Sequence, residues 1–138
     1  MPVEENKALV RRLYQLYYSE KGNCDAAYEL HASDLVIHSG GLDTHLDELK
    51  QFDATLGVAF AEGTATVDNM LGEGDKVAFQ VHIKAKHVGQ FLGVSPTGKA
   101  IDITNTYVVR MVDGRISEWW GNVDMLGMKR QIGAIPKA

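Results

Sequence analysis

The spacing of apolar residues divides the chain into a helical first half and a strand-rich second half. Apolar side chains recur every three or four positions from Val3 to about Tyr18, over a short segment at 26–30, and from Thr44 to about Phe60. This spacing predicts three amphipathic helices. A brief apolar run, Leu35 to His38, lies between the last two and predicts a strand.

Residues that favour helix ends lie near the expected boundaries. Gly22 ends the first predicted helix, and Asn23 is placed to cap the second. Thr44 and Asp47 have the spacing of a capping box, in which the side chain of each satisfies a backbone N–H of the other. We therefore expect the third helix to begin next to Thr44.

The second half of the chain alternates apolar and polar residues with the period of a strand. Thr64 to Leu71 is the first predicted strand of this half, and Lys76 to His87 follows after a glycine-containing turn. Ile101 to Met111 comes next, with Asn105 interrupting its apolar face, and Arg115 to about Asp124 returns after a tight Asp-Gly turn. Helices followed by antiparallel strands predict an α+β fold in which a bent sheet wraps around the helices.

Composition narrows the class of protein without identifying an activity. The chain of 138 residues fits one domain, with 45% hydrophobic residues, 23% charged residues and a formal net charge of −4, so no nucleic-acid partner is expected. No apolar run approaches the roughly 20 residues needed to span a bilayer, so no membrane partner is expected. The single Cys24 and the lack of a signal-peptide pattern favour a cytoplasmic protein.

The register of the last hairpin decides which of its polar residues face inward. A two-residue turn pairs Tyr107 with Trp120 and turns Asp124 toward the interior. A three-residue loop with a glycine bulge pairs Tyr107 with Trp119 and turns Gly121 inward instead. Asp124 is then free to cap the C-terminal turn.

Several polar residues lie on apolar faces. His87 continues the apolar face of its strand, where it either bonds the backbone as a core residue or contacts a ligand. Asn105 and Tyr107 need hydrogen-bond partners or a ligand. Asp34 and His38 could pair locally, and the histidines show no metal-ligand spacing, so we expect no metal site.

A family resemblance is carried by the glycine-rich loop, His87-Val88-Gly89-x-Phe91-x-Gly93-x-x-Pro96-Thr97-Gly98-Lys99, which is similar to the signature loop of SnoaL-like polyketide cyclases. Further segments follow in the family's order: Arg110-x-x-Asp113-Gly114-Arg115-Ile116-x-Glu118, Asp124-x-x-Gly127 and Gln131-Ile132-Gly133. The resemblance implies a single SnoaL-like domain over residues 1–138, with the cone-shaped α+β barrel of the nuclear-transport-factor-two-like superfamily. It implies a curved, mostly antiparallel sheet around the N-terminal helices, a hydrophobic cavity, and neither cofactor nor metal.

The resemblance also suggests where the chemistry lies. The family's namesake enzymes close a ring by intramolecular aldol condensation, with an aspartate as general acid/base and a nearby histidine on the last two strands. At the aligned positions this chain has Gly121 and Tyr107. Asp124 is the nearest remaining carboxylate, so we expect Asp124 and His87 to be catalytic. We expect one tryptophan to line the cavity and the other to lie at the surface, and the full expected substrate-binding set is Tyr107, Asn105, Trp120, Trp119, His38, Asn122 and Tyr14.

These inferences lead to one expected function and two alternatives. We expect a cofactor-independent cyclase or isomerase that uses acid/base chemistry on an apolar, polyketide-like carbonyl compound. A non-catalytic binding protein for a hydrophobic small molecule, with the same cavity, is one alternative, because Gly121 and Tyr107 depart from the family's catalytic pair. A hydrolase or oxygenase without a cofactor is the other. We also expect a homodimer, because the outer sheet face has to be covered or solvated.

Overall fold

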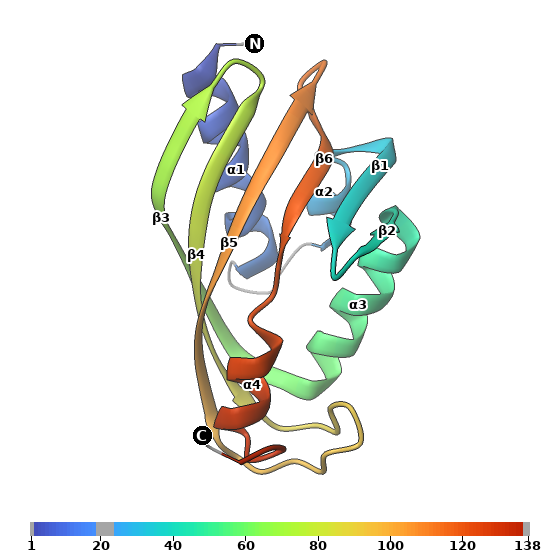
Figure 1. Cartoon of the computed structure of the whole chain (residues 1–138), viewed down its shortest axis with the longest axis vertical. Coiled ribbons are helices and arrows are strands. Elements are labelled where there is room, and N and C mark those ends of the chain that lie inside the picture. The colour runs from blue at the N-terminus through green and yellow to red at the C-terminus, as the bar shows by residue number, and fades with distance from the viewer. Residues whose placement is uncertain (1, 19–23, 137–138) are drawn as a thin grey trace.

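The computed structural model describes residues 2–18 and 24–136 and has the predicted helical first half and strand-rich second half (Figure 1). Its elements are α1 (Val3–Tyr18), α2 (Cys24–Tyr28), β1 (His31–Ser39), β2 (Leu42–Thr44), α3 (Leu46–Ala59), β3 (Phe60–Glu73), β4 (Lys76–His87), β5 (Ala100–Val112), β6 (Arg115–Asn122) and α4 (Met125–Gln131).

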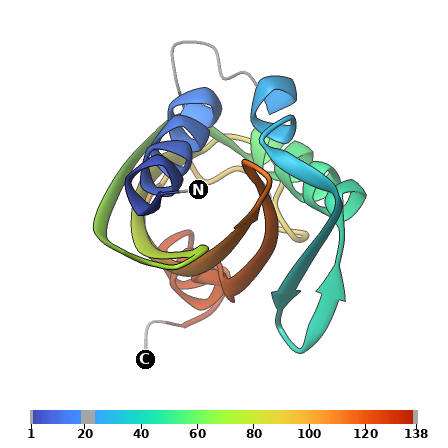
Figure 2. The same ribbon diagram turned by 90° about the horizontal axis from the view of Figure 1, so that it is seen from above.

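The strands form one six-stranded mixed sheet in the order β2-β1-β6-β5-β4-β3. Neighbouring strands are antiparallel except for β1 and β6, which are parallel. The sheet curves around the helices without closing, with α1 against β3 and β4 and α3 against β1 and β3 (Figure 2). The predicted cone-shaped α+β fold is therefore confirmed, with an open sheet in place of a closed barrel.

Several helix and strand boundaries follow the sequence patterns, although β1 and β3 each begin four residues earlier than predicted and β2 was not predicted. The bounds of α1 and β4 are those predicted. The predicted capping box is wrong, because Thr44 ends strand β2 and the N-cap of α3 is His45, which makes no side-chain cap bond. Its Nδ1 instead donates to the carbonyl oxygen of Leu35 at 2.9 Å. The predicted helix-end residues Gly22 and Asn23 lie outside the described residues.

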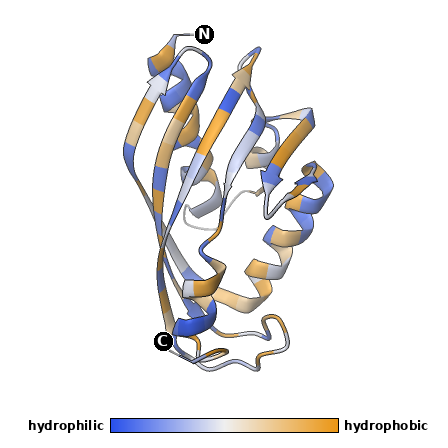
Figure 3. Cartoon of the chain, viewed as in Figure 1, coloured by the Kyte–Doolittle hydropathy of each residue, from blue (hydrophilic) through white to orange (hydrophobic). Residues whose placement is uncertain are grey.

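The alternating residues of the long strands separate the two faces of the sheet. Val77, Phe79 and Val81 of β4 are buried toward the helices, whereas Lys84 points to the opposite face. Apolar and polar residues alternate along β3, β4 and β5 in Figure 3. This alternation makes the concave face apolar, and the helices pack against it. Each aliphatic or aromatic side chain buried there contributes about 1.5–3 kcal/mol to the stability of the fold.

The buried residues form two clusters along the sheet. The upper core, beside α1, consists of Val10, Leu13, Leu16, Ala27, Leu35, Val77, Phe79, Val81, Val109, Met111, Ile116 and Trp119. The lower core, beside α4 and the loop after β4, consists of Ala59, Phe91, Ile101, Ile103, Met128 and Ile132.

The last hairpin has neither of the two predicted registers. Its two-residue turn pairs Met111 with Ile116, but a bulge at Ser117 then shifts the pairing by one residue. Beyond the bulge, Tyr107 faces Gly121. Gly121 therefore lies on the inward face, as the second predicted register required, although through a different shift.

Candidate active site

Four of the predicted substrate-binding residues meet on the concave face of the sheet. The centroid of the Tyr107 ring lies 5.1 Å from that of Trp119 and 5.8 Å from that of Phe79. The Phe79 ring in turn lies 5.7 Å from the ring of Tyr14. Asn105 is on the same inward line of β5 as Tyr107. Tyr14 and Tyr107 face inward and are half-buried.

Asn105 is buried and its polar atoms have partners. Its Oδ1 accepts the backbone N–H of Asp124 at 2.8 Å, which ties the start of α4 to β5. Burial raises the pKa of the Tyr107 hydroxyl, and a hydrogen bond from the Asn105 side chain partly offsets this rise. Asn105 therefore positions the Tyr107 hydroxyl as well as the C-terminal helix.

The ring of Tyr107 lies so close to Gly121 that it limits which residue position 121 can hold. Gly121 has φ +136°, and a Cβ at this position would lie 2.8 Å from Cδ1 of Tyr107 and even closer to the carbonyl oxygen of Thr106. Any other residue would strain the backbone and displace the tyrosine ring. The chain therefore lacks an inward carboxylate here because the aromatic ring occupies that space.

Three of the predicted substrate-binding residues lie on the other face of the sheet or at its edge. Trp120 faces outward, stacked on His38 at 5.3 Å, which confirms that one tryptophan lies inside and the other outside. His38 is hydrogen-bonded to Asp43 and Glu118, both at 2.7 Å. These two residues take the place of Asp34, the partner expected from the sequence. Asn122 is exposed and accepts hydrogen bonds from Ser39 Oγ and Gly40 N, so it fixes the β1–β2 turn.

Asp124 does not reach the interior. It is exposed, and its carboxylate accepts the backbone N–H of Gly127 at 2.8 Å as the N-cap of α4. The capping role considered from the sequence is confirmed. The register that would have turned Asp124 inward is not formed, because the pairing shifts by one residue at Ser117.

His87 lies in the lower part of the molecule, away from Tyr107. Tyr107 pairs with Phe79 of β4, and His87 lies eight positions further along that strand. At the rise of a β-strand this separation is about 26 Å along the strand. The imidazole is fully buried, with Nδ1 2.9 Å from Thr97 Oγ1 and accepting the backbone N–H of Thr97 at 3.3 Å. This arrangement anchors the loop that follows β4. Nε2 is buried and has no partner within the described part of the chain.

Asp53 is a candidate functional residue that the sequence analysis missed. It lies on α3, half-buried, and its Oδ2 accepts a hydrogen bond from the Tyr28 hydroxyl at 2.8 Å. Burial raises the pKa of the Asp53 carboxyl, and hydrogen bonds from Tyr28 and Tyr17 partly offset the rise. The sequence did hold a signal, since Asp53 falls within the apolar stripe formed by Leu49 and Leu56 at helical spacing.

Tyrosines from three elements share the surroundings of Asp53. Burial is the main reason why the pKa of each tyrosine hydroxyl is raised, and for Tyr18 the pKa rises to about 12. The nearby Asp53 carboxylate adds to the rise in the pKa of Tyr14, Tyr17 and Tyr107. All of these hydroxyls therefore stay protonated at neutral pH and can donate hydrogen bonds.

Two buried ring nitrogens of the upper interior also have no partner among the described residues. His31 donates from Nδ1 to the carbonyl oxygen of Ala27 at 3.0 Å, which leaves Nε2 as an unpaired acceptor. Burial lowers the pKa of His31 to about 4, so the ring is neutral. The indole N–H of Trp119, whose ring stacks on His31, is an unpaired donor.

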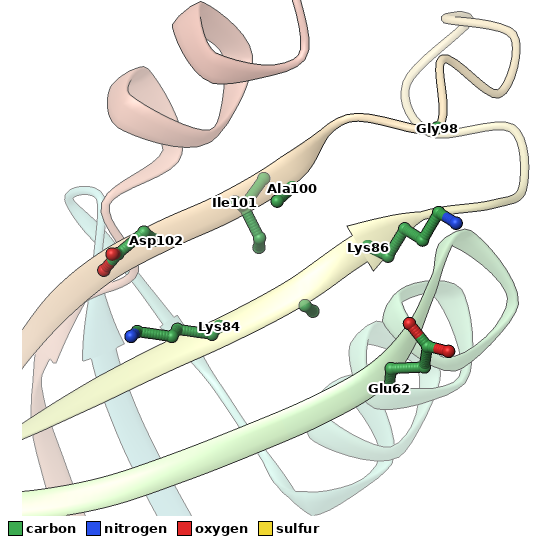
Figure 4. A pocket seen from close by; sticks show the side chains of 8 residues that line it. Glu62, Lys84, Lys86, Gly98, Ala100, Ile101 and Asp102 are labelled. Atoms are coloured by element: carbon green, nitrogen blue, oxygen red, sulfur yellow. The ribbon is translucent and has the colours of Figure 1, made fainter.

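Two of the hollows on the surface of the described residues involve little of this machinery. One lies on the outer sheet face, lined by Glu62, Lys84, Ala85, Lys86, Gly98, Ala100, Ile101 and Asp102 (Figure 4). The other lies between α1 and β3 and includes Tyr14 and Tyr18. Among the described residues, no group of three or more His, Cys, Asp or Glu side chains could hold a metal ion, and no helix could cross a membrane.

Comparison with known proteins places this architecture in a known class. AclR from Streptomyces galilaeus, described as a candidate hydroxylase, superposes with a TM-score of 0.91 at 23% identity, over 99% of this chain and 86% of AclR. IdmH from Streptomyces antibioticus, a candidate polyketide cyclase, superposes with a TM-score of 0.82 at 28% identity, over 93% and 98% of the two chains. The curved sheet around helices is thus the cone-shaped α+β fold of such proteins.

Sequence comparison identifies the family. The model of the SnoaL-like polyketide cyclases matches residues 7–132, so the chain belongs to that family. Its relatives include the aklanonic acid methyl ester cyclase DauD of Streptomyces sp. (strain C5), 30% identical over 91% of this chain and 80% of DauD. The corresponding cyclase DnrD of Streptomyces peucetius is also 30% identical, over 91% of this chain and 88% of DnrD.

Proposed function

We propose that this protein is a cofactor-independent enzyme that cyclises or isomerises an apolar, polyketide-like carbonyl compound by acid/base chemistry. The observation that carries the proposal is the contact between the inward-facing rings of half-buried Tyr107 and buried Trp119, in a chain that belongs to a family of cyclases. Aromatic walls suit a flat, largely apolar substrate. Tyr107, Asn105, Trp119 and Tyr14 are the proposed substrate-binding residues.

The chemistry is an intramolecular aldol condensation. A base removes a proton from the carbon next to one carbonyl group, and the resulting enolate carbon forms a bond to a second carbonyl carbon of the same molecule. The new alkoxide takes up the proton that the base received. Substrate and product are isomers and no electrons are exchanged with another molecule, so the reaction itself requires no redox cofactor.

The enolate oxygen needs hydrogen-bond donors in a place from which water is largely excluded. The indole N–H of Trp119 is buried and unpaired among the described residues, and the Tyr107 hydroxyl stays protonated. We assign these two groups the stabilisation of the enolate oxygen. Replacing Trp119 with Phe should therefore lower kcat by at least about 10-fold while keeping most of the ring's packing.

The proposal is tested by incubating the purified protein with aklanonic acid methyl ester, the compound named for the relatives DauD and DnrD. Chromatography with mass detection should show a product of unchanged mass and altered retention, formed faster than with heat-denatured protein. Absence of turnover with this compound and with related open-chain keto esters contradicts the proposal. A product heavier by one oxygen atom would instead identify the oxygenase alternative.

A non-catalytic binding protein is the second candidate. Gly121 occupies the position of the family's expected aspartate, and Asp124 is exposed as a helix cap. Under this alternative, the same compounds quench the fluorescence of Trp119 at saturating concentration without any conversion. The two measurements together separate binding with turnover from binding without it.

The expected homodimer is retained as a proposal about the outer sheet face. On this face, Val108 of β5 pairs with Trp120 of β6, and both side chains are only half-buried. Val112, at the end of β5, is exposed. A second copy could cover these apolar groups. Light scattering coupled to gel filtration should give twice the mass of one chain, and Trp120→Glu should reduce it to that of a monomer.

A further inference from the structure

The geometry points to Asp53 as the general acid/base of this protein, acting from helix α3 in place of a carboxylate on the last strands. This inference rests on the proposed function, because it assigns the residue that moves the proton in the aldol reaction. It concerns a residue outside the loop and hairpin that carry the family resemblance.

The carboxylates of the chain support this choice by elimination. Among the Asp and Glu residues that the structure describes, only Asp53 and Glu118 are not exposed. Glu118 lies on the outer sheet face, where Arg110 and His38 occupy its two oxygens at 2.8 and 2.7 Å. Asp124 is a helix cap at the surface. Asp53 is the remaining carboxylate with a partly apolar environment.

The position of Asp53 directs it toward the substrate-binding residues. Leu49 and Leu56, four residues before it and three after it, pack against the upper and lower cores, so this stripe of α3 faces the inside of the cone. Tyr28 holds Oδ2 by a single hydrogen bond of 2.8 Å. A tyrosine that donates to a carboxylate fixes its orientation without neutralising it.

The titratable groups that interact electrostatically with Asp53 come from α1, α2 and β5. Tyr17 and Tyr18 belong to α1, Cys24 and Tyr28 to α2, and Tyr107 to β5. From its own helix, Lys50 Nζ lies 5.4 Å from the centroid of the Tyr28 ring. Burial dominates over the tyrosine hydrogen bonds and raises the pKa of Asp53, which makes its carboxylate a stronger base than an exposed one.

The step is a simple proton transfer. The ionised carboxylate of Asp53 takes the proton from the carbon next to the substrate carbonyl, and the electron pair of that C–H bond forms the enolate. After the carbon–carbon bond has formed, the neutral carboxyl group returns the proton to the alkoxide oxygen. Asp53 therefore ends each cycle ionised, as it began.

The test uses a probe that does not depend on the aldol substrate. Ring opening of 5-nitrobenzisoxazole needs only removal of a proton from carbon, since the electron pair forms the nitrile and the N–O bond breaks to release a coloured phenolate. We expect the full-length protein to accelerate this reaction and Asp53→Asn to lose about 100-fold of the rate. Asp47→Asn is the matched control, an identical substitution at an exposed position of the same helix, with unchanged rate.

The pH profile separates a base from a structural residue. The rate should rise with pH as Asp53 ionises. The Tyr28 hydrogen bond lowers the pKa of Asp53, so Tyr28→Phe should move the midpoint of the profile to higher pH while keeping catalysis. This variant also tests the inference if Asp53→Asn does not fold.

Each outcome decides the inference. It is overturned if the wild type does not accelerate the ring opening, if Asp53→Asn retains the wild-type rate, or if Tyr28→Phe leaves the midpoint in place. Ring opening that depends on Asp53, without any conversion of the keto esters, overturns the proposed aldol function and leaves Asp53 as an accessible base. The two failures are therefore distinguishable.

Discussion

The lower core and the surroundings of Asp53 both lie on the concave side of the sheet, and their aromatic residues differ in burial. Around His87, the residues Phe91 and Ile101 are almost fully buried. Around Asp53, inward-facing Tyr14 and Tyr107 remain half-buried. Tight packing at one end supplies stability, which allows the other end to keep polar groups that are only partly buried.

A polar residue on an apolar face has a different role in each region. His87 is locked by Thr97 and anchors the adjacent loop. Asp53 is held by Tyr28, is still reached by solvent, and has its pKa raised by partial burial. Position on an apolar face therefore predicts function only when the surrounding packing leaves room for a substrate.

The largest expected effect comes from opening the lower core. Phe91→Ala should lower the free energy of unfolding by about 3–5 kcal/mol, because the ring is fully buried and a cavity remains. Urea denaturation measures this loss. The initial rate of 5-nitrobenzisoxazole ring opening, measured where the variant is still folded, should stay near the wild-type rate. A fall in that rate as large as the one for Asp53→Asn would show that the two regions do not have separate roles.

The second effect concerns the contact between Gly121 and Tyr107. Gly121→Ala should cost about 1–3 kcal/mol of unfolding free energy, because φ is +136° and the added methyl group meets the tyrosine ring. In a double-mutant cycle with Tyr107→Ala, the combined cost should be smaller than the sum of the two single costs. Strict additivity would mean that the ring does not exclude a side chain at position 121.

A smaller effect is expected at the cap of α4. Asp124→Ala should lower the unfolding free energy by about 1 kcal/mol through loss of the bond to Gly127 N, whereas Asp124→Asn should lose much less. Thermal unfolding of the two variants measures the difference. If Asp124→Asn abolished turnover of the keto esters while Asp53→Asn did not, the chemistry would have to be assigned to Asp124.

The smallest effect is a pH dependence on the outer face. Hydrogen bonds to Glu118 and Asp43 raise the pKa of His38, so its stabilising contribution is fully present below the unfolded value of 6.5 and is lost as pH rises through the raised folded value. The unfolding temperature of wild type should exceed that of His38→Gln more at about pH 5 than at about pH 9. An equal difference at both pH values would contradict this account.

Much of the fold could be predicted from local patterns. The period of two over β4 and the helical spacing of α1 gave their bounds correctly, because alternation and helical periodicity are properties of neighbouring residues. Strand β2 was missed, since the three residues Leu42–Thr44 are too few to show a period and Thr44 with Asp47 resembled a helix start.

The candidate site was predicted less well than the fold. Tyr107, Asn105, Trp119 and Tyr14 do meet on the concave face, because the strand and helix periods already placed them inward. The hairpin register was wrong beyond Ser117, because a single-residue bulge leaves no periodic signal and reverses every side chain after it.

Local patterns in the sequence are enough to establish the α+β class, the alternating strands and, through the loop and hairpin motifs, the resemblance to the family. The exposed capping position of Asp124 and the contact of Asp53 with Tyr28 become visible only in the folded chain. The physical reason is that a carboxylate's pKa and reach depend on groups distant in sequence, here 25 residues apart on two different helices.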